Sequence, residues 1–356
     1  MRVLTLVPNQ LGYAPGQRGS IELWEKVLTP AGIELDYAPF ETDELRKVLY
    51  APGNNTKKAF EMVRGYFNRF QLLRDLDKFD AVFVYREAAL IGPAILERLV
   101  ARKKPVIYQL DDPLFIPYRS QYNGHFAKLK FVGKIKEIIS LSKVVMVNSS
   151  HIEDYARQFN KNIWRVPSVV DTDKYIYNAQ DQDVDRPIVG WSGSPTTAQN
   201  LRLIQEPLKV LSERKNCDIR FIGSSDPGLD GVSYSTQKWN GSTEVDDLRR
   251  LQIGLVPLAD LVWNPYKFIM KTAQYMALGI VPVGTPIASN PEVIQHGENG
   301  FLAESNEDWV RYIQLLIDDK ELRMKLSSQA AKDAEANYSL RSQTSKVVEA
   351  FRAAIR

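Results

Sequence analysis

The sequence predicts an α/β protein made of two Rossmann-like, doubly wound domains that face a central cleft. Three observations support this fold class. The chain has 356 residues, which is more than one ordinary hydrophobic core accommodates. Short apolar, β-branched runs alternate with helical stretches almost from end to end, as in parallel sheets covered on both faces. The apolar periodicity stops once, over residues 169–187, where Asp, Asn and Gln dominate.

The order of elements follows from the apolar runs. Strands are expected at 2–7, 79–85, 105–110, 143–149 and 163–168, and then at 187–193, 217–223, 253–258 and 280–285. Helical stretches at 20–31, 91–102 and 150–159 separate the first strands, and the chain beyond Trp309 is continuously helical. We therefore expect a first domain over 1–168, a linker over 169–187, a second domain over 188–338 and a final helix over 339–356.

The composition excludes several classes of protein. Apolar residues make up 44% and charged residues 25% of the chain, which is ordinary for a globular protein. The start, MRVLTLVPNQLG, reads as a strand and a loop, without the longer apolar stretch of a signal peptide, and no apolar run is long enough to span a membrane. Cys217 is the single cysteine, so neither an intrachain disulfide nor a thiolate metal cluster is expected. These features favour a cytoplasmic protein.

Two segments mix basic and apolar residues at helical spacing, Lys57 to Arg74 and Lys128 to Lys143. Such a pattern permits an amphipathic helix with a cationic rim. The simpler interpretation is a solvated face on a packed helix. The alternative is peripheral contact with an anionic membrane, at its inner face, or with a phosphate-bearing acceptor. In the second segment the residues concerned are Lys128, Lys130, Lys134 and Lys136 around Leu129, Phe131, Val132 and Ile135. Nucleic acid is not an expected partner, because no recognised reading motif accompanies the charge.

The loops after the strands are the expected binding positions, because ligands of parallel sheets bind at the carboxyl ends of the strands. After the first strand, Gly12, Gly16 and Gly19 precede a helix that Ser20 could cap, and Arg18 adds a charge. Glycines let backbone N–H groups approach a ligand closely. The spacing is not that of a dinucleotide fingerprint, so an ordinary flexible loop explains these residues as well.

A pair of acidic residues, Asp111 and Asp112, ends the strand at 105–110. Adjacent carboxylates repel each other unless something binds them. One of them is expected to contact a substrate hydroxyl and the other to hold the loop, with Arg86 close enough to neutralise one carboxylate. Capping of the next turn is the alternative. No metal is expected, because no further ligand residues at suitable spacing lie nearby.

Two further patterns suggest a diphosphate site in the second half. Ser192, Gly193 and Ser194 form a small turn before a helix, where free N–H groups and the helix dipole favour an anion, although simple N-capping explains the same residues. Lys267 and Lys271 are four residues apart and therefore share one face if both are helical. Two ammonium groups on one face are favoured when an anion lies between them, and two solvated lysines are the alternative.

The segment KFIMKTAQYMALGIVPVGTPIASNPEVIQHGENGFLAES resembles the donor-binding region of the GT-B glycosyltransferases of family 4. VPSVVDTDKY, YREA and YQLDDPLF resemble other parts of a bacterial branch of that family. The resemblance implies a retaining transferase whose first domain is on the acceptor side and whose second domain binds a nucleotide-sugar. It also implies that the final helix crosses back to the first domain.

The chain departs from that family at known positions. The family typically carries two glutamates eight residues apart, which contact the sugar and the ribose, and these positions correspond to Tyr266 and Gln274 here. Gln274 can bind ribose hydroxyls as a neutral amide. Glu292 matches a donor-side loop of the family, or caps a helix. The Arg and Lys that many members carry after the first strand of the donor domain are missing, so Lys267 and Lys271 are expected to supply the charge.

These patterns together predict a metal-independent, retaining glycosyltransferase without a cofactor, acting in surface polysaccharide or glycoconjugate synthesis. Its substrates would be a nucleotide-diphosphate sugar and a glycan or lipid-linked acceptor. The expected catalytic residues are Asp111, Asp112, Lys267 and Lys271. The donor side would comprise Ser192, Gly193, Ser194, Tyr266, Gln274 and Glu292, and the acceptor side Gly16, Arg18, Gly19 and Arg86. A nucleotide-sugar epimerase or hydrolase and a non-catalytic nucleotide-sugar-binding protein are the alternatives.

Overall fold

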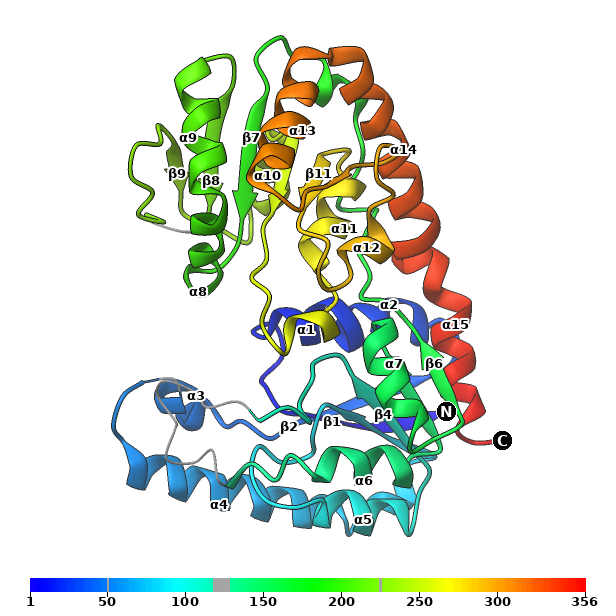
Figure 1. The fold of residues 1–356 in the computed structure, drawn as a ribbon. Coiled ribbons are helices and arrows are strands. Elements are labelled where there is room, and N and C mark those ends of the chain that lie inside the picture. Colours follow the sequence, from blue (N-terminus) through cyan, green and yellow to red (C-terminus); the bar gives the residue numbers. More distant parts are fainter. Residues whose placement is uncertain (50, 118–128, 224–225) are drawn as a thin grey trace. The chain divides into compact units, whose positions relative to one another are not determined.

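A computed structural model of the protein divides into two compact units. Unit 1 comprises Met1–Ser168 and Gln343–Arg356, and unit 2 comprises Val169–Ser342. The structure describes residues 1–49, 51–117, 129–223 and 226–356. Each unit contains a six-stranded sheet in which all paired strands are parallel, so the predicted class of two doubly wound α/β units is confirmed (Figure 1).

The sheet of unit 1 has the strand order β2-β1-β3-β4-β5-β6. Its strands are β1 (Arg2–Val7), β2 (Glu34–Pro39), β3 (Ala81–Tyr85), β4 (Val106–Leu110), β5 (Val144–Val147) and β6 (Ile163–Arg165). Every residue of β3, β4 and β5 is buried, because helices cover both faces of the sheet. Strand β2 was not expected from the sequence, since it lies at the edge and has no fully buried residue.

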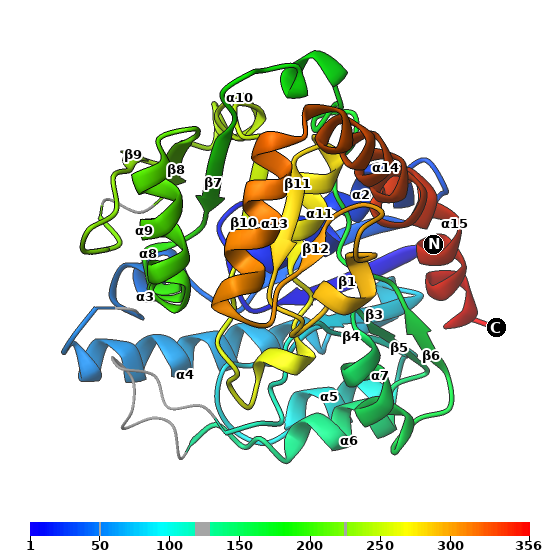
Figure 2. The ribbon, with the colours of Figure 1, turned by 45° about the horizontal axis from the view of Figure 1, so that its top comes forward.

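The helices of unit 1 form a layer on each face of this sheet (Figure 2). Among the described residues they are α1 (Pro15–Gln17), α2 (Leu23–Leu28), α3 (Asp43–Leu49), α4 (Asn55–Leu72), α5 (Ile95–Ala101), α6 (Lys134–Leu141), α7 (Ser150–Arg157), the π-helix η1 (Arg18–Glu22) and the 3-10 helix η2 (Leu76–Lys78). Helix α15 (Leu340–Ala353) begins in unit 2 and ends in unit 1, where Phe351 stacks on Phe83 of β3 with ring centroids 5.3 Å apart.

The sheet of unit 2 has the strand order β12-β11-β10-β7-β8-β9. Its strands are β7 (Ile188–Ser192), β8 (Asp218–Ile222), β9 (Ser235–Gln237), β10 (Ile253–Val256), β11 (Val281–Gly284) and β12 (Phe301–Leu302). The fully buried strands β10 and β11 lie inside the sheet and match the apolar runs in the sequence. The short edge strands β9 and β12 carry too little apolar periodicity to be recognised.

Two hydrophobic cores lie on the two faces of this second sheet. One packs α9 (Gln205–Arg214) and α13 (Asn306–Asp318) against the strands, and the other packs α10 (Glu244–Arg249), α11 (Met270–Ala277) and α14 (Lys320–Tyr338). The shorter elements are η4 (Ala179–Gln182), α8 (Pro195–Ala198), η5 (Gln199–Ile204), η6 (Asn264–Tyr266) and α12 (Asn290–Val293). Ser305 starts α13 with a capping box to Asp308, which explains the sharp onset of helix there.

Residues 169–187, the expected linker, lie within unit 2, where Val170 pairs with Ser339 and Gln182 is buried. Two expectations about local structure are corrected. Helix formation after β1 begins at Pro15, so Ser20 is not an N-cap, and its hydroxyl instead donates to the carbonyl of Gly16 over 2.7 Å. Lys134 does not belong to a cationic rim, because its ammonium is buried 2.7 Å from Glu87. Lys128 lies outside the described residues.

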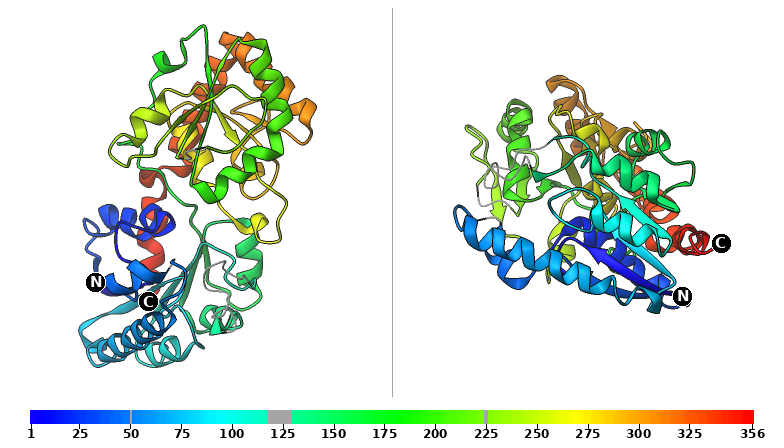
Figure 3. Two further views of the ribbon diagram at one scale, coloured as in Figure 1. Left: turned by 90° about the vertical axis from the view of Figure 1, so that its left-hand side faces the viewer. Right: turned by 90° about the horizontal axis from the view of Figure 1, so that it is seen from below.

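Within the described part of the chain, no helix is both long and apolar enough to cross a membrane. Figure 3 shows the two sheets and their covering helices from two further directions.

Candidate active site

In each unit, polar side chains gather where parallel strands end. In unit 1 these strands are β3 and β4, which pair in register from Val82 with Val106 to Tyr85 with Gln109. Their next residues, Arg86 and Asp111, therefore emerge at the same edge of the sheet. The N-terminal turn of α1 reaches the same place.

Arg86 and Asp111 form a partly buried, two-pronged ion pair at this edge. Arg86 Nε lies 2.6 Å from Asp111 Oδ1, and Arg86 Nη2 lies 3.0 Å from Oδ2. Tyr85 donates its hydroxyl hydrogen to Asp111 Oδ2 over 2.6 Å. Although burial opposes the charge, the neighbouring Asp111 raises the pKa of Arg86 well above its usual value. The contact expected between Arg86 and the acidic pair is confirmed, and the Asp111 carboxylate is fully engaged by it.

Asp112 differs from its neighbour in exposure. Its side chain is 32% exposed, compared with 6% for Asp111, and its Oδ2 lies 3.4 Å from Arg86 Nη2. Arg86 itself adopts a left-handed backbone conformation with φ of 61°, which is uncommon for a residue with a side chain. Such strain is kept only where the surroundings hold it, and it is common at functional sites. Of the two carboxylates, that of Asp112 is therefore the better placed to meet a ligand.

Gly16 is required by this cluster. A Cβ atom at this position would lie 2.7 Å from the Tyr85 hydroxyl and 2.9 Å from Asp111 Oδ2, so any side chain would clash. Gly19 and Arg18 follow within η1, and Arg18 Nε is buried without a hydrogen bond inside the described structure. The predicted glycine loop is thus partly helical, and its role is close packing against the acidic pair.

In unit 2 the central feature is Lys271, on the first turn of α11. Its ammonium nitrogen lies 4.2 Å from the centre of the Trp191 ring, an interaction between a cation and an aromatic face. Within the described residues it has no carboxylate partner, and burial lowers the pKa of this amine to about 7. The residue as a whole is only half-buried, so a ligand could reach the amine. An unpaired, partly desolvated lysine of this kind is a candidate anion-binding group.

Lys267 does not share a helical face with Lys271, and that prediction is wrong. Helix α11 begins at Met270, whereas Lys267 ends η6 with an extended backbone of φ −85° and ψ 136°. Ser289 holds this stretch extended, because its N–H donates to the carbonyl of Lys267 over 3.1 Å and its hydroxyl accepts from the N–H of Ile269 over 2.7 Å.

The turn at Ser192–Ser194 is more constrained than expected. The N–H of Ser192 donates to the Tyr275 hydroxyl over 2.8 Å, and the N–H of Gly193 donates to the carbonyl of Ile222 over 3.0 Å. These two donors are therefore used within the unit, and α8 is only four residues long. The expected cradle of free N–H groups is not formed by Ser192 and Gly193. Gly193 instead allows close contact, because a Cβ there would lie 2.4 Å from the Trp191 ring.

The remaining predicted donor residues differ in their surroundings. Gln274 donates its amide hydrogen to the Tyr175 hydroxyl over 2.9 Å. Tyr266 is half-buried at the end of η6, and Glu292 is exposed on α12, with its carbonyl accepting from the Tyr338 hydroxyl over 3.3 Å. Near α12, a buried network from Thr272 through Asn290 to the carbonyl of Thr285 fixes the loop after β11.

The aromatic members of both clusters, Tyr85, Trp191, Tyr175 and Tyr275, were not predicted from the sequence. Trp191 could have been recognised, since it lies at the end of a buried strand, directly before a Ser-Gly-Ser turn. The face of an aromatic ring at such a position is expected to pack against another group. The tyrosines look like ordinary core residues in the sequence. No group of three or more His, Cys, Asp or Glu side chains suited to a metal occurs among the described residues.

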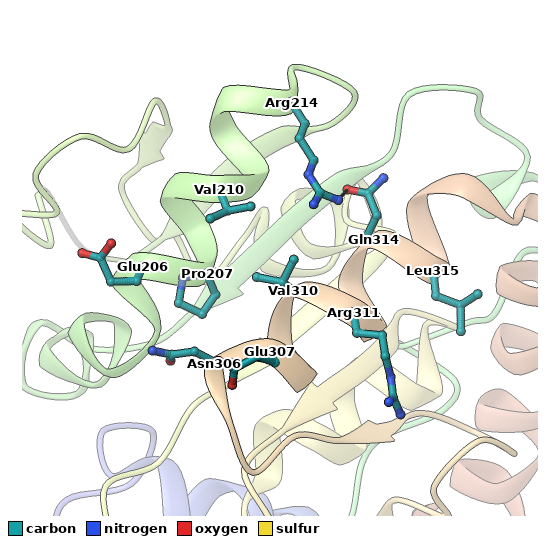
Figure 4. Close-up of a pocket in the computed structure, with 10 residues that line it drawn as sticks. All are labelled: Glu206, Pro207, Val210, Arg214, Asn306, Glu307, Val310, Arg311, Gln314 and Leu315. Atoms are coloured by element: carbon teal, nitrogen blue, oxygen red, sulfur yellow. Dashed lines mark hydrogen bonds between the residues drawn. The ribbon is translucent and has the colours of Figure 1, made fainter.

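A groove of about 640 Å³ lies elsewhere in unit 2, between α9 and α13, with the Arg214–Gln314 hydrogen bond at one side (Figure 4). The surface that lines it is mainly apolar, so this groove is a poor candidate for catalysis.

Comparison with known proteins supports the architecture. Residues 268–333 match the family described as glycosyl transferases group 1. A search of curated proteins finds no relative. Among solved structures, the chain resembles sucrose-phosphate synthase from Thermosynechococcus elongatus, with a TM-score of 0.71, 12% identity, and 99% of this chain and 98% of that chain covered.

Two other solved structures lead to the same conclusion. A glycosyltransferase from Rickettsia africae has a TM-score of 0.71 and 15% identity, with 100% and 98% of the two chains covered. HepE from Anabaena, solved with UDP and glucose, has a TM-score of 0.67 and 14% identity, with 99% and 100% covered. The protein therefore has the GT-B fold, with a segment similar to the group 1 glycosyl transferases across α11 to α14.

Proposed function

We propose that the protein is a glycosyltransferase that moves a sugar from a nucleotide-diphosphate sugar to a glycan or lipid-linked acceptor. The observation that carries this proposal is Lys271, which lies over Trp191, has no carboxylate partner among the described residues, and falls inside the segment that matches the group 1 glycosyl transferases. Of the solved structures with the same fold, one was determined with UDP and glucose and another with ADP and acarbose.

The donor is assigned to unit 2. The diphosphate would lie against the amine of Lys271, which is positioned over the Trp191 ring. Burial lowers the pKa of this amine, and an adjacent anion would raise it again and so favour the charged ammonium. Lys267 would add a second charge from the extended stretch before α11. Gln274 would contact the ribose, and Tyr266 and Glu292 the sugar or the loop around it. Stabilising the charge on the leaving diphosphate is the main contribution that these residues can make to the reaction.

The acceptor side is assigned to unit 1. The partly buried Arg86–Asp111 pair would hold the loop after β4, and the more accessible Asp112 carboxylate would accept a hydrogen bond from a sugar or acceptor hydroxyl. Arg18 and the Gly16–Gly19 turn would complete this side. Retention at the anomeric carbon, independence of metal and cofactor, and a role in polysaccharide or glycoconjugate synthesis belong to the same proposal.

One observation favours a second candidate, a nucleotide-sugar-binding protein without turnover. Two positions that carry glutamates in the resembled family are Tyr266 and Gln274, and the Gln274 amide is already bonded to Tyr175. A ligand screen followed by product analysis separates the two candidates. Nucleoside diphosphates and nucleotide-sugars are first ranked by thermal shift, and the best donor is then incubated with glycan and lipid-linked acceptors.

Transfer of the sugar to an acceptor, lost in Lys271→Met, would support the transferase. Binding without release of nucleoside diphosphate across all acceptors would support the second candidate. Release of free sugar without an acceptor would indicate a hydrolase, and protection by no nucleotide at all would refute the donor-site assignment.

A further inference from the structure

Helix α4 directs an apolar stripe away from the protein. Phe60, Val63, Phe67 and Phe70 are 66%, 68%, 62% and 44% exposed. Their spacing of three and four residues places them on one face of the helix. A continuous row of large, exposed apolar residues is typical of a surface that binds a membrane or another molecule. Of the two interpretations left open by the sequence, a packed helix with a solvated cationic face would place these apolar residues inside, whereas contact with an anionic membrane or a phosphate-bearing acceptor would leave them outside.

The inner face of α4 explains this orientation. Lys58, Glu61, Gly65 and Arg69 are the buried residues of the helix. The Arg69 guanidinium donates to three backbone carbonyls, those of Val7, Ala38 and Ala88. Thr42 donates to Glu61 over 2.5 Å, and a Cβ on Gly65 would lie 2.7 Å from the ring of Phe40. Rotating the helix to bury its phenylalanines would leave these polar groups unpaired, so the apolar stripe must stay outside.

A second segment continues the stripe. Leu129 and Phe131, before α6, are 44% and 48% exposed. The carbonyl of Leu129 accepts from the N–H of Gly92 over 2.8 Å, and the neighbouring carbonyl of Ile91 accepts from the hydroxyl of Tyr66 on α4. The turn at residues 91–92 therefore ties the two apolar segments together within unit 1.

The charges on this surface are mainly positive. The exposed charged residues of α4 are Lys57 and Arg64, and those of residues 129–136 are Lys130 and Lys136. Lys57 and Lys47 each lie 2.6 Å from the single carboxylate of Glu44, so these three side chains together keep a net positive charge. The nearest carboxylate to Arg64 is the buried Glu61, 3.7 Å away.

We propose that this surface docks onto an anionic phospholipid bilayer. We call it the α4 face, and it consists of Phe60, Val63, Phe67, Phe70, Leu129 and Phe131 with Lys57, Arg64, Lys130 and Lys136. Apolar side chains would enter the boundary between headgroups and acyl chains while the cations meet lipid phosphates. A second copy of the chain is a poorer occupant, because pairing two such faces would bring cations against cations. The proposal goes beyond the transferase function, and its test measures binding without turnover.

The test is co-sedimentation of the full chain with two kinds of vesicle, phosphatidylcholine alone and phosphatidylcholine containing phosphatidylglycerol. We expect binding to the anionic vesicles that weakens with added salt. Phe60→Gln/Phe67→Gln should lower the partition coefficient about 100-fold, roughly tenfold for each phenylalanine. Lys57→Gln/Arg64→Gln should lower it about fivefold for each charge removed.

Matched controls separate the α4 face from general stickiness. Ile355→Gln removes an apolar side chain that is 51% exposed elsewhere in unit 1, and Lys209→Gln/Lys325→Gln removes two exposed charges from unit 2. Both should bind like the unchanged protein, and circular dichroism should confirm that all variants fold.

The proposal fails if the unchanged protein ignores anionic vesicles at low salt, or if the phenylalanine variant binds as well as the control. It also fails if size-exclusion chromatography shows that the phenylalanines mediate self-association while vesicles are ignored. Sugar transfer could persist in each of these outcomes, so they leave the proposed function intact.

Discussion

Lys271 should take up a proton when a nucleoside diphosphate binds. In the unliganded protein, burial lowers the pKa of this amine from 10.5 to about 7. At about pH 8, roughly a tenth of the molecules would then carry the ammonium charge. A diphosphate next to the amine favours the charged form, so its pKa must rise on binding. Binding is therefore coupled to protonation.

The size of the effect follows from the two pKa values. If the bound form titrates at about 9 or above, binding at about pH 8 takes up about 0.8 proton or more. The affinity should fall as pH rises, by about six- to eightfold between about pH 7.5 and 8.5, because binding consumes a proton whose concentration decreases. The diphosphate itself does not interfere, since its last ionisation, near pH 6, is complete.

Isothermal titration calorimetry measures this proton directly. The observed enthalpy is compared at one pH in two buffers that differ in ionisation enthalpy, and the difference gives the number of protons taken up. Lys271→Met should abolish the uptake and weaken binding. Lys267→Met should weaken binding but keep the uptake, because Lys271, the lysine over the Trp191 ring, is still present.

The reasoning would be refuted by an unchanged protein that binds diphosphate without proton uptake. It would also be refuted by a Lys271→Met variant that shows the same uptake as the unchanged protein, since another group would then be responsible.

Three further predictions concern stability and turnover. The folded-state pKa of Lys271 lies below its unfolded value, so the lysine destabilises the fold most below about pH 7, and this penalty disappears as pH rises towards 10.5. Lys271→Met should therefore raise the melting temperature near neutral pH, with a difference that shrinks on the alkaline side. Asp112→Asn should lower turnover, with or without a chelator, and leave the melting temperature nearly unchanged, whereas Asp111→Asn should lower the melting temperature because it removes a buried charge partner. If a chelator abolishes activity and a divalent ion restores it, the prediction that Asp112 acts without a metal is contradicted. Gly16→Ala should impair both folding and turnover, because the added Cβ clashes with Asp111. Gly133→Ala should be neutral in both assays, because a Cβ there would meet no side chain within 4 Å.

Much of the fold was accessible from the sequence because buried parallel strands have an unmistakable signature. β3, β4, β5, β10 and β11 are continuous apolar runs, and helices cover them on both sides. The edge strands β2, β9 and β12 lack that signature, because β2 and β9 contain no buried residue and β12 contains only one. Apolar periodicity in the sequence indicates burial, so it does not reveal strands that are mostly unburied.

The candidate site was only partly accessible. That Arg86 could reach the acidic pair followed from strand order alone, since adjacent parallel strands end at one edge. The division of roles between Asp111 and Asp112 did not follow, because it depends on which carboxylate is buried against Tyr85. The pairing of Lys267 with Lys271 was misjudged, because Ser289, about twenty residues further on, holds the chain extended before α11.

The sequence by itself determined the two α/β sheets and the positions of the loops at their carboxyl ends, since both follow from local patterns of burial. Only the tertiary structure decided what surrounds each side chain. It placed Lys271 over Trp191, where burial lowers the pKa of its amine. It also turned the phenylalanines of α4 outward, because Arg69 and Glu61 find their hydrogen-bond partners inside. Such environments depend on contacts between distant segments, and these contacts leave no periodic trace in the chain.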